Sequence, residues 1–156
     1  NTKFYPMTNK RPFSPEEFKK IYSKVPRLCV DLIIKTPGGI ALSLRSIEPY
    51  KGEWHFPGGT VFYKEKITDT IERVAIEETG IPLKADKLLG YIEYPTEDVK
   101  GRGFGYTVSM AFLCLTDRSD LKPSKESLEI RTFKKLPPDL IEEQRNFLEK
   151  IKLKNL

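Results

Sequence analysis

Runs of apolar residues divide the chain into short strands. Apolar and β-branched residues fill 28–35 and 40–45, on either side of a Gly38-Gly39 turn, and predict two strands joined by that turn. Comparable runs predict further strands at 54–56, 88–94, 106–116 and 130–133. Strands outnumber helices along the chain, and their order is mixed, which predicts an α+β fold or an α/β sandwich.

Apolar residues at helical spacing predict three helices. The first begins at Ser14, because serine stands at the N-cap with Glu17 at the third helical position, and it ends before Pro26. The second spans 67–79. The third covers roughly 140–152, with apolar residues recurring on one face. Helices and strands follow one another without a linker, so residues 1–156 are predicted to form one domain.

Composition adds limits to this prediction. The chain is 38% hydrophobic and 31% charged, which is ordinary for a soluble protein, and we expect no membrane association. Its net charge of +5 is spread along the sequence, so we do not expect nucleic acid as a partner. Residues 1–14 read as an arm outside the core. Cys29 and Cys114 lie in apolar runs without metal-ligand spacing, and we interpret both as reduced core residues of a cytoplasmic protein.

Acidic residues interrupt the apolar face of the predicted helix 67–79. Glu78 falls in the middle of the stripe formed by Ile71, Val74 and Ala75, and Glu77 lies at its margin. A carboxylate in such a place is costly unless it is paired or binds a cation. The alternative is a helix in a shallow groove, with Glu78 near its solvated end. The periodicity alone favours neither interpretation.

Residues just before this helix add signals for a bound cation. Gly58 and Gly59 allow the backbone to approach a ligand closely. Glu65 precedes the first turn, and Arg73 lies along the helix, where its planar guanidinium suits orienting a carboxylate. Mg²⁺ prefers a few carboxylate and carbonyl oxygens together with substrate phosphates.

This segment, residues 58–81, resembles the box of the Nudix hydrolase family. The family pattern is Gly, five residues, Glu, seven residues, then Arg-Glu-apolar-any-Glu-Glu-any-Gly-apolar. Residues 59–81 read G-TVFYK-E-KITDTIE-R-V-AI-EE-T-G-I, so every fixed position matches except Val74, where the family has glutamate. The resemblance implies a Nudix-type α/β/α sandwich with a mixed sheet, and hydrolysis of a nucleoside diphosphate derivative with Mg²⁺ or Mn²⁺. It also implies a site with metal ligands at Glu77, Glu78 and a backbone carbonyl of Gly58 or Gly59, and an orienting pair, Arg73 and Glu65.

Val74 bears on the number of metals and on activity. Residues 74, 77 and 78 share one face of the helix, so a glutamate at 74 would have added a carboxylate to the cluster. Valine predicts fewer metals, such as one. Either the chain is an active one-metal enzyme, or it is a silent nucleotide-binding domain. Because Arg73, Glu77 and Glu78 are retained, we favour activity.

A one-metal box is a feature of GDP-mannose mannosyl hydrolases, and the first third of the chain is similar to that subgroup. The similarity implies that Asp31 and Arg45 contact the substrate; the alternatives are a strand-end acid in a salt bridge and a surface cation. Two positions depart from the subgroup. Thr60 replaces an arginine, and Ser127 replaces the histidine that acts as the base in attack at the sugar carbon.

Glu126 aligns with the metal-binding glutamine of that subgroup. A late-loop glutamate binds metal or acts as general base in many diphosphate-cleaving relatives, so Glu126 favours attack at phosphorus over attack at the sugar carbon of GDP-mannose. The alternative is a solvated loop acid. The only histidine, His55, is interpreted as a packed strand residue.

Aromatic residues near a basic loop suggest where a nucleobase stacks. Tyr94, Phe104 and Tyr106 flank the loop that carries Arg102, and aromatics beside cations suit a base above a diphosphate. Packing at strand ends is the alternative. We expect a small nucleotide, such as a nucleotide sugar, as the partner. The subgroup resemblance also suggests a homodimer formed through the N-terminal arm and helix.

Overall fold

The computed structural model describes residues 11–153. The arm predicted for residues 1–14 therefore lies largely outside the described residues. Within the described residues, three α-helices, one short 3-10 helix and seven strands follow in the order α1 (Pro15–Tyr22), β1 (Arg27–Thr36), β2 (Gly39–Arg45), β3 (Trp54–His55), β4 (Gly58–Thr60), α2 (Ile67–Thr79), β5 (Ala85–Tyr94), η1 (Glu97–Val99), β6 (Thr107–Leu115), β7 (Ser127–Phe133) and α3 (Glu142–Lys150).

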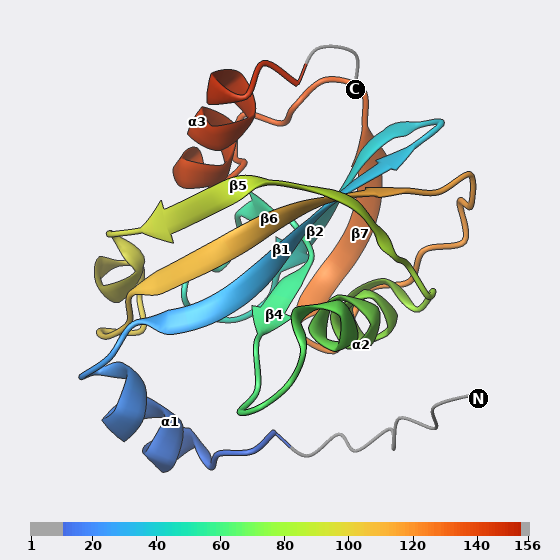
Figure 1. The fold of residues 1–156 in the computed structure, drawn as a ribbon. Coiled ribbons are helices and arrows are strands. Elements are labelled where there is room, and N and C mark those ends of the chain that lie inside the picture. The colour runs from blue at the N-terminus through green and yellow to red at the C-terminus, as the bar shows by residue number, and fades with distance from the viewer. Residues whose placement is uncertain (1–10, 154–156) are drawn as a thin grey trace.

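The strands form one mixed sheet, in the order β3-β2-β1-β6-β5, with β4 added to β1 and β7 added to β2. β1 and β6 run parallel, and the remaining pairs are antiparallel. α2 and α3 lie on opposite faces of this sheet, and α1 lies beyond one end of it (Figure 1). The α/β/α sandwich predicted from the sequence is confirmed.

One edge of β1 carries two different partners. Residues 34–36 pair with β2, whereas residues 29–31 pair with β4. β2 must therefore diverge from β1 where β4 begins. This split places β4, with Gly58 and Gly59, against the middle of β1.

Each face of the sheet has its own apolar core. On the α3 side, Ile33, Leu42 and Phe56 are fully buried with Phe147 and Leu148 from the helix against them. On the α2 side, the buried set includes the following residues from the strands and the helix: Val30, Leu32, Ile34, Ile71, Val74 and Ala75. The apolar stripe predicted for α2 is the stripe that packs on the sheet.

The termini of the first two helices match the sequence predictions. Ser14 accepts a hydrogen bond from the backbone of Glu17, and the Glu17 side chain accepts one from the backbone of Ser14, which forms the expected capping box. α2 covers 67–79 as predicted and stops at Gly80, whose φ of 74° is the left-handed conformation that terminates helices.

Three strands and one helix differ from the prediction. β4 was missed because its glycines give no apolar signal. β5 and β7 begin three residues earlier than predicted, in exposed or half-buried polar stretches that pair through the backbone. α3 is shorter than 140–152 because Leu140 and Ile141 are held by backbone bonding around Trp54 before the helix begins.

No helix in residues 11–153 is long and apolar enough to cross a membrane. Cys29 and Cys114 are both buried and free, as predicted. The cytoplasmic location inferred from them stays a prediction.

Candidate functional site

Arg73 joins α2 to the strand and loop that precede it. Its guanidinium donates to both carboxylate oxygens of Glu65 at 2.8 and 2.9 Å, to the carbonyl of Thr60 at 2.7 Å and to Glu77 at 3.0 Å. The Phe62 ring covers it, 3.8 Å from the guanidinium carbon. These bonds use most of the guanidinium donors. Arg73 therefore ties β4 and the loop before α2 to the helix, and it also orients the Glu77 side chain.

Glu65 is held as a carboxylate by these contacts. Burial raises its pKa, but hydrogen bonds from Arg73, Thr70 and the backbone of Phe62 outweigh burial and leave the pKa below its usual value. The predicted Arg73–Glu65 pair is therefore present in the structure, as an ion pair that orders the loop before α2.

The two glycines before α2 stand where a side chain would not fit. A Cβ at Gly58 would overlap the Asp31 carboxylate, and a Cβ at Gly59 would lie 2.9 Å from a methyl of Val74. Gly59 thus lets α2 approach β4 through Val74, which is fully buried. Both glycines belong to β4 and pair with Val30 and Asp31 in the middle of β1.

Glu78 is half-buried at the C-terminal end of α2, as its place in the apolar stripe predicted. Burial raises its pKa to about 7; a hydrogen bond with Ser124 lowers it, Glu77 raises it, and Arg45 and Arg11 lower it. Glu77, in contrast, is exposed and paired with Arg73. Burial and a like charge both disfavour the ionised form of Glu78, and a cation would relieve both effects.

The donors present fit a divalent cation held by few protein ligands. Among residues 11–153, no three His, Cys, Asp or Glu side chains gather in a metal-binding group. Glu126 therefore does not complete a three-carboxylate cage with Glu77 and Glu78. Two carboxylates and a carbonyl of the Gly58-Gly59 turn remain, which suits Mg²⁺, since this ion usually keeps waters and substrate phosphates in its coordination sphere.

Asp31 and Tyr94, each named separately from the sequence, form a buried pair. The Tyr94 hydroxyl donates to Asp31 at 2.5 Å and accepts from the Gln144 amide of α3 at 3.0 Å. The other end of Gln144 accepts from the backbone of Phe56 at 2.7 Å. Burial raises the Asp31 pKa to about 6, although the Tyr94 hydrogen bond opposes the rise. Asp31 is thus a mid-strand acid within a buried network, and the strand-end salt bridge considered for it is not what the structure has.

Arg45 is half-buried at the end of β2 and donates to the carbonyl of Pro49 at 2.5 Å. Burial and the nearby charge of Arg27 lower its pKa, whereas Glu78 raises it. Arg45 is therefore not the surface cation considered as its alternative. Its charge interacts with those of Glu78, Arg27 and Arg102.

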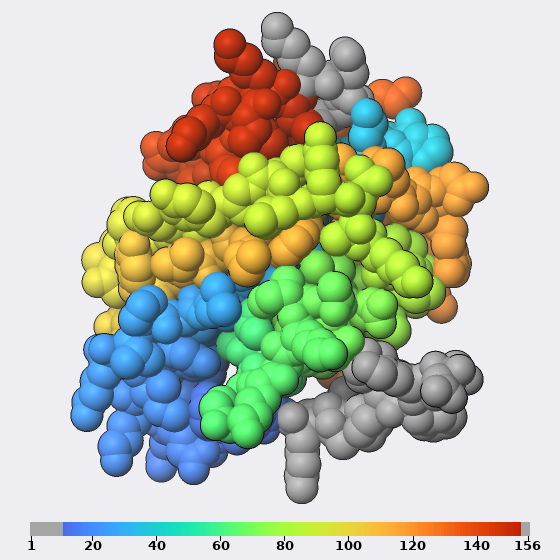
Figure 2. All heavy atoms as spheres, viewed as in Figure 1, coloured from blue at the N-terminus to red at the C-terminus, as the bar shows by residue number. Residues whose placement is uncertain are grey.

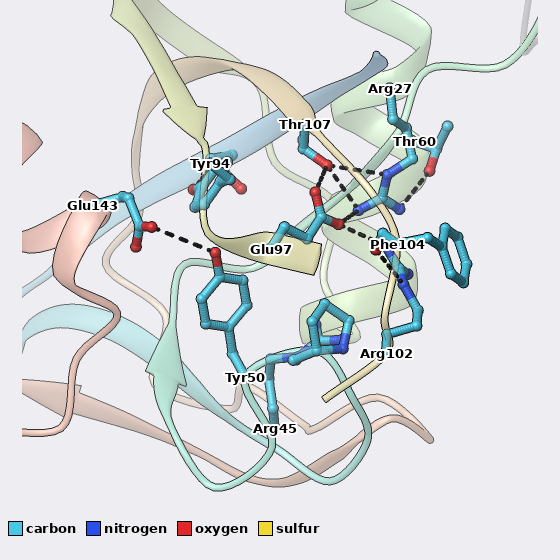
Figure 3. A network of polar contacts seen from close by, with 12 residues as sticks. Arg27, Arg45, Tyr50, Thr60, Tyr94, Glu97, Arg102, Phe104, Thr107 and Glu143 are labelled. Carbon is cyan, nitrogen blue, oxygen red and sulfur yellow. Dashed lines mark hydrogen bonds and ion pairs between the residues drawn. The ribbon is translucent and has the colours of Figure 1, made fainter. Parts of the chain in front are cut away.

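A second polar cluster was not recognised in the sequence. Glu97, with a side chain only 2% exposed, accepts from Arg27 at 3.3 Å, Arg102 at 2.7 Å and Thr107 at 2.6 Å (Figure 3). Arg27 also donates to the hydroxyl of Thr60 at 3.2 Å. A guanidinium from β1 thus lies against the position where the similar subgroup carries an arginine. A single arginine directly after Pro26 gave no periodic signal that could have revealed this.

The remaining predicted aromatics are placed apart from Tyr94. Phe104 packs beside Arg102, whereas Tyr106 is 38% exposed and donates to Glu93 at 3.1 Å. Tyr106 directly precedes β6, and its partner Glu93 is the neighbour of Tyr94 in β5, where successive side chains point to opposite faces. Both Phe104 and Tyr106 line a surface hollow of about 480 Å³ against the segment after α1.

Glu126 and His55 have contrasting environments. Glu126 precedes β7, is 35% exposed and forms an ion pair with Arg11, while its backbone N–H donates to Ser124, the residue that also contacts Glu78. His55 is buried, and burial lowers its pKa to about 3, so it remains neutral. The interpretation of His55 as a packed strand residue is confirmed.

Comparison with known proteins agrees with this geometry. The NUDIX domain family matches residues 25–153. The low-salt glycan biosynthesis protein Agl8 of Haloferax volcanii is 38% identical over 125 residues, which cover 79% of each chain. The ADP-ribose pyrophosphatase of Methanocaldococcus jannaschii is 32% identical over 69% of this chain and 62% of its own length. A MutT NUDIX hydrolase from Burkholderia pseudomallei superimposes with a TM-score of 0.70 at 26% identity, covering 80% of this chain and 97% of that one.

Proposed function

The chain belongs to the Nudix hydrolase family, and we propose that it cleaves the diphosphate linkage of a nucleoside diphosphate derivative, with nucleotide sugars as the favoured class. The observation that carries this proposal is Glu78, a half-buried carboxylate beside Glu77 and opposite Arg45. Acids placed near a glycine-containing strand and a half-buried arginine suit a metal-bound diphosphate. The resemblance of the chain to a glycan biosynthesis protein supports a sugar-linked substrate.

The family generally uses divalent metals, and we propose Mg²⁺, with Mn²⁺ as a substitute. Glu78, Glu77 and a carbonyl of Gly58 or Gly59 would hold the ion. When bound, such an ion neutralises phosphate charge and helps to orient water. Val74 is fully buried against Gly59, so the side chain at that position contributes packing in place of a further ligand.

The protein groups divide the remaining work. Arg73 keeps Glu77 and the glycine strand in register with α2 through its bonds to Glu65 and Thr60. Arg45 supplies positive charge beside Glu78, where a phosphate oxygen would lie. Asp31, oriented by Tyr94, faces the glycine turn and is proposed to contact the group attached to the diphosphate.

Glu126 is proposed to orient or deprotonate the attacking water at phosphorus. It shares Ser124 with Glu78, which supports its placement near the metal ligands. Its ion pair with Arg11 must open for this role. Attack at the sugar carbon of GDP-mannose is the alternative reaction. Neither residue considered as its base supports it, since Ser127 begins β7 and His55 is buried and neutral.

A substrate panel tests the proposal. Nucleotide sugars, ADP-ribose and dinucleotides are incubated with Mg²⁺ and wild-type protein, Glu78→Gln, or Glu72→Gln, which changes a glutamate on the same helix. We expect nucleoside monophosphate from wild type and Glu72→Gln, and none from Glu78→Gln. Free sugar with nucleoside diphosphate, with ¹⁸O from water in the sugar, would establish carbon attack; ¹⁸O in the nucleoside diphosphate would mean attack at phosphorus. No Glu78-dependent product would overturn the proposed activity and favour a silent nucleotide-binding domain.

We also propose that the protein forms a homodimer through α1. This helix carries Phe18, Ile21 and Tyr22 on one side but buries none of its residues fully against its own chain. It lies at the end of the molecule, against the start of β1 and the loop that follows η1 (Figure 2). Light scattering at micromolar concentration tests this, and a monomeric mass would refute it.

A further inference from the structure

Two arginines share one buried carboxylate at the start of β1 and β6. Arg27 and Arg102 have side chains 21% and 19% exposed, and Glu97 lies between them, 2% exposed. In Figure 3 the two guanidinium groups converge on Glu97 from different segments of the chain. One carboxylate balances one guanidinium, so this pair of arginines keeps one unit of positive charge in a half-buried place.

A third arginine, Arg45, lies within the field of this pair, with Glu78 and Glu97 opposing their effect on its pKa. Arg27 and Arg102 both lower the pKa of Arg45 after burial does, which places the three cations within reach of one another's field. Burial, followed by Arg27, also lowers the pKa of Arg102. Like charges held together away from water destabilise a fold unless an anion compensates them.

The donors of Arg102 are only partly used. One nitrogen, Nη2, donates to Glu97, and Nε makes a long bond of 3.5 Å to the carbonyl of Phe104. Among the described residues, none accepts a hydrogen bond from Nη1. Arg27, by comparison, uses Nε, Nη1 and Nη2 on Thr107, Thr60 and Glu97. Arg102 is thus held mainly through Nη2, and its guanidinium has donors left for a ligand.

Aromatic rings limit where that ligand lies. The Arg102 guanidinium lies 4.4 Å from the centroid of the Phe104 ring and 5.4 Å from that of Phe18. Arg27 lies 5.5 Å from the same Phe18 ring. The rings pack against both guanidinium groups, and Arg27 also donates to Thr60 of β4, so the cluster lies next to the strand that carries Gly58 and Gly59.

We propose that Arg27 and Arg102, held in place by Glu97, form an anion subsite for the diphosphate of the substrate. This inference rests on the proposed function for its ligand, because the turn next to Thr60 is where the metal carbonyls are placed. A simple structural tie between β1, η1 and β6 would need one arginine on Glu97. The second guanidinium, with unused donors, is the feature that a tie does not explain.

Binding without metal separates this subsite from catalysis. ADP, GDP, UDP and CDP are titrated calorimetrically in EDTA against wild type, Arg102→Gln, Arg102→Lys and Arg118→Gln. Arg118 is an exposed arginine paired with Asp120 in another loop, so its variant makes the same change of charge elsewhere. For the nucleotide that wild type binds best, we expect Arg102→Gln to weaken binding at least about ten-fold. Lysine should recover part of the loss, and Arg118→Gln should bind like wild type.

Glu97→Gln distinguishes a ligand role from a structural one. It removes the same salt bridge but leaves both guanidinium groups, so the subsite predicts that nucleotide binding is kept or strengthened. If the cluster is only structural, Arg102→Gln and Glu97→Gln lose binding alike, and the proposal is overturned. Thermal melting identifies a variant that fails to fold. If Glu97→Gln fails to fold, the nucleotide affinity of Arg102→Lys decides: affinity partly recovered relative to Arg102→Gln supports the subsite, and no recovery overturns it.

The same titrations keep this inference apart from the proposed activity. Wild type that binds no nucleoside diphosphate in EDTA would overturn the subsite, whatever the hydrolysis assay shows. Arg102-dependent binding by a protein that cleaves no member of the panel would uphold the subsite and refute the proposed reaction.

Discussion

The polar groups beside α2 come from one stretch of chain, whereas those on the opposite face of the sheet come from five separate elements. Glu65, Arg73 and Glu77 lie within one loop and helix and are partly exposed. Asp31, Tyr94, Gln144, Glu97 and Thr107, from β1, β5, α3, η1 and β6, are all buried. Groups near in sequence are ordered by local geometry, but a dispersed cluster exists only when the whole fold has formed.

The two regions therefore should respond differently to substitution. Beside α2, the acidic side chains are partly exposed and can contact a metal or substrate, so their loss should affect turnover more than folding. On the far face, the five buried side chains named above are hydrogen-bonded, so their loss should affect folding. Val74 marks the boundary, since it lies on the box helix but belongs to the core.

The largest expected effect on stability comes from Val74→Glu, which places a carboxylate in the core. This substitution restores the family residue, but the position is fully buried beside Gly59, so we expect a loss of about 3 kcal/mol or more in the free energy of unfolding. Ile76 lies on the same helix and is 39% exposed, so Ile76→Glu should change the free energy of unfolding by less than about 0.5 kcal/mol. Urea unfolding measures both. A stable Val74→Glu protein with higher activity would show that α2 adapts to a further ligand.

Glu78→Gln should have the second-largest effect, and on turnover alone. Burial raises the Glu78 pKa to about 7, so its charged form is disfavoured in the folded protein, and glutamine should leave stability equal or higher. Removing a metal ligand should reduce kcat by at least about 100-fold, since even residues behind the ligands cost 10 to 100-fold. Steady-state kinetics and a melting curve on one preparation separate the effects. A fall in both together would make Glu78 a structural residue.

The same contrast explains how much the sequence predicted. The bounds of α2 and the half-buried Glu78 follow from the periodicity of one helix. The Arg73–Glu65 pair follows from the resemblance to the Nudix box, and the structure has all three. Asp31 and Tyr94 were named individually, but their pairing depends on β1 and β5 flanking β6. Nothing local marks Gln144 or Glu97 as functional, because each meets its partners only through tertiary packing.

Tyr94→Phe should have an intermediate effect and tests the buried network. Without the hydroxyl, Asp31 loses a donor at 2.5 Å and the Gln144 amide loses its acceptor, so we expect about 1–3 kcal/mol less stability. Tyr106→Phe removes an exposed hydroxyl bound to Glu93 and should cost less than about 0.5 kcal/mol. Denaturant titration of the two variants compares the stability lost with a buried and with an exposed tyrosine hydroxyl. Equal costs would mean that burial does not distinguish these tyrosines.

The smallest expected effect is a pH dependence of stability from His55. Burial lowers its folded pKa to about 3, whereas the unfolded chain has the ordinary value of about 6.5. As pH falls below that value, the unfolded state takes up a proton that the folded state refuses, so stability falls. Between pH 7 and 5.5 this group should remove about 1 kcal/mol. His55→Asn retains a donor for the Phe56 carbonyl but cannot titrate, so the difference between wild type and variant should shrink over that interval. A difference in stability that does not change with pH would mean that His55 takes up its proton as readily in the folded protein as in the unfolded chain, which would contradict the prediction.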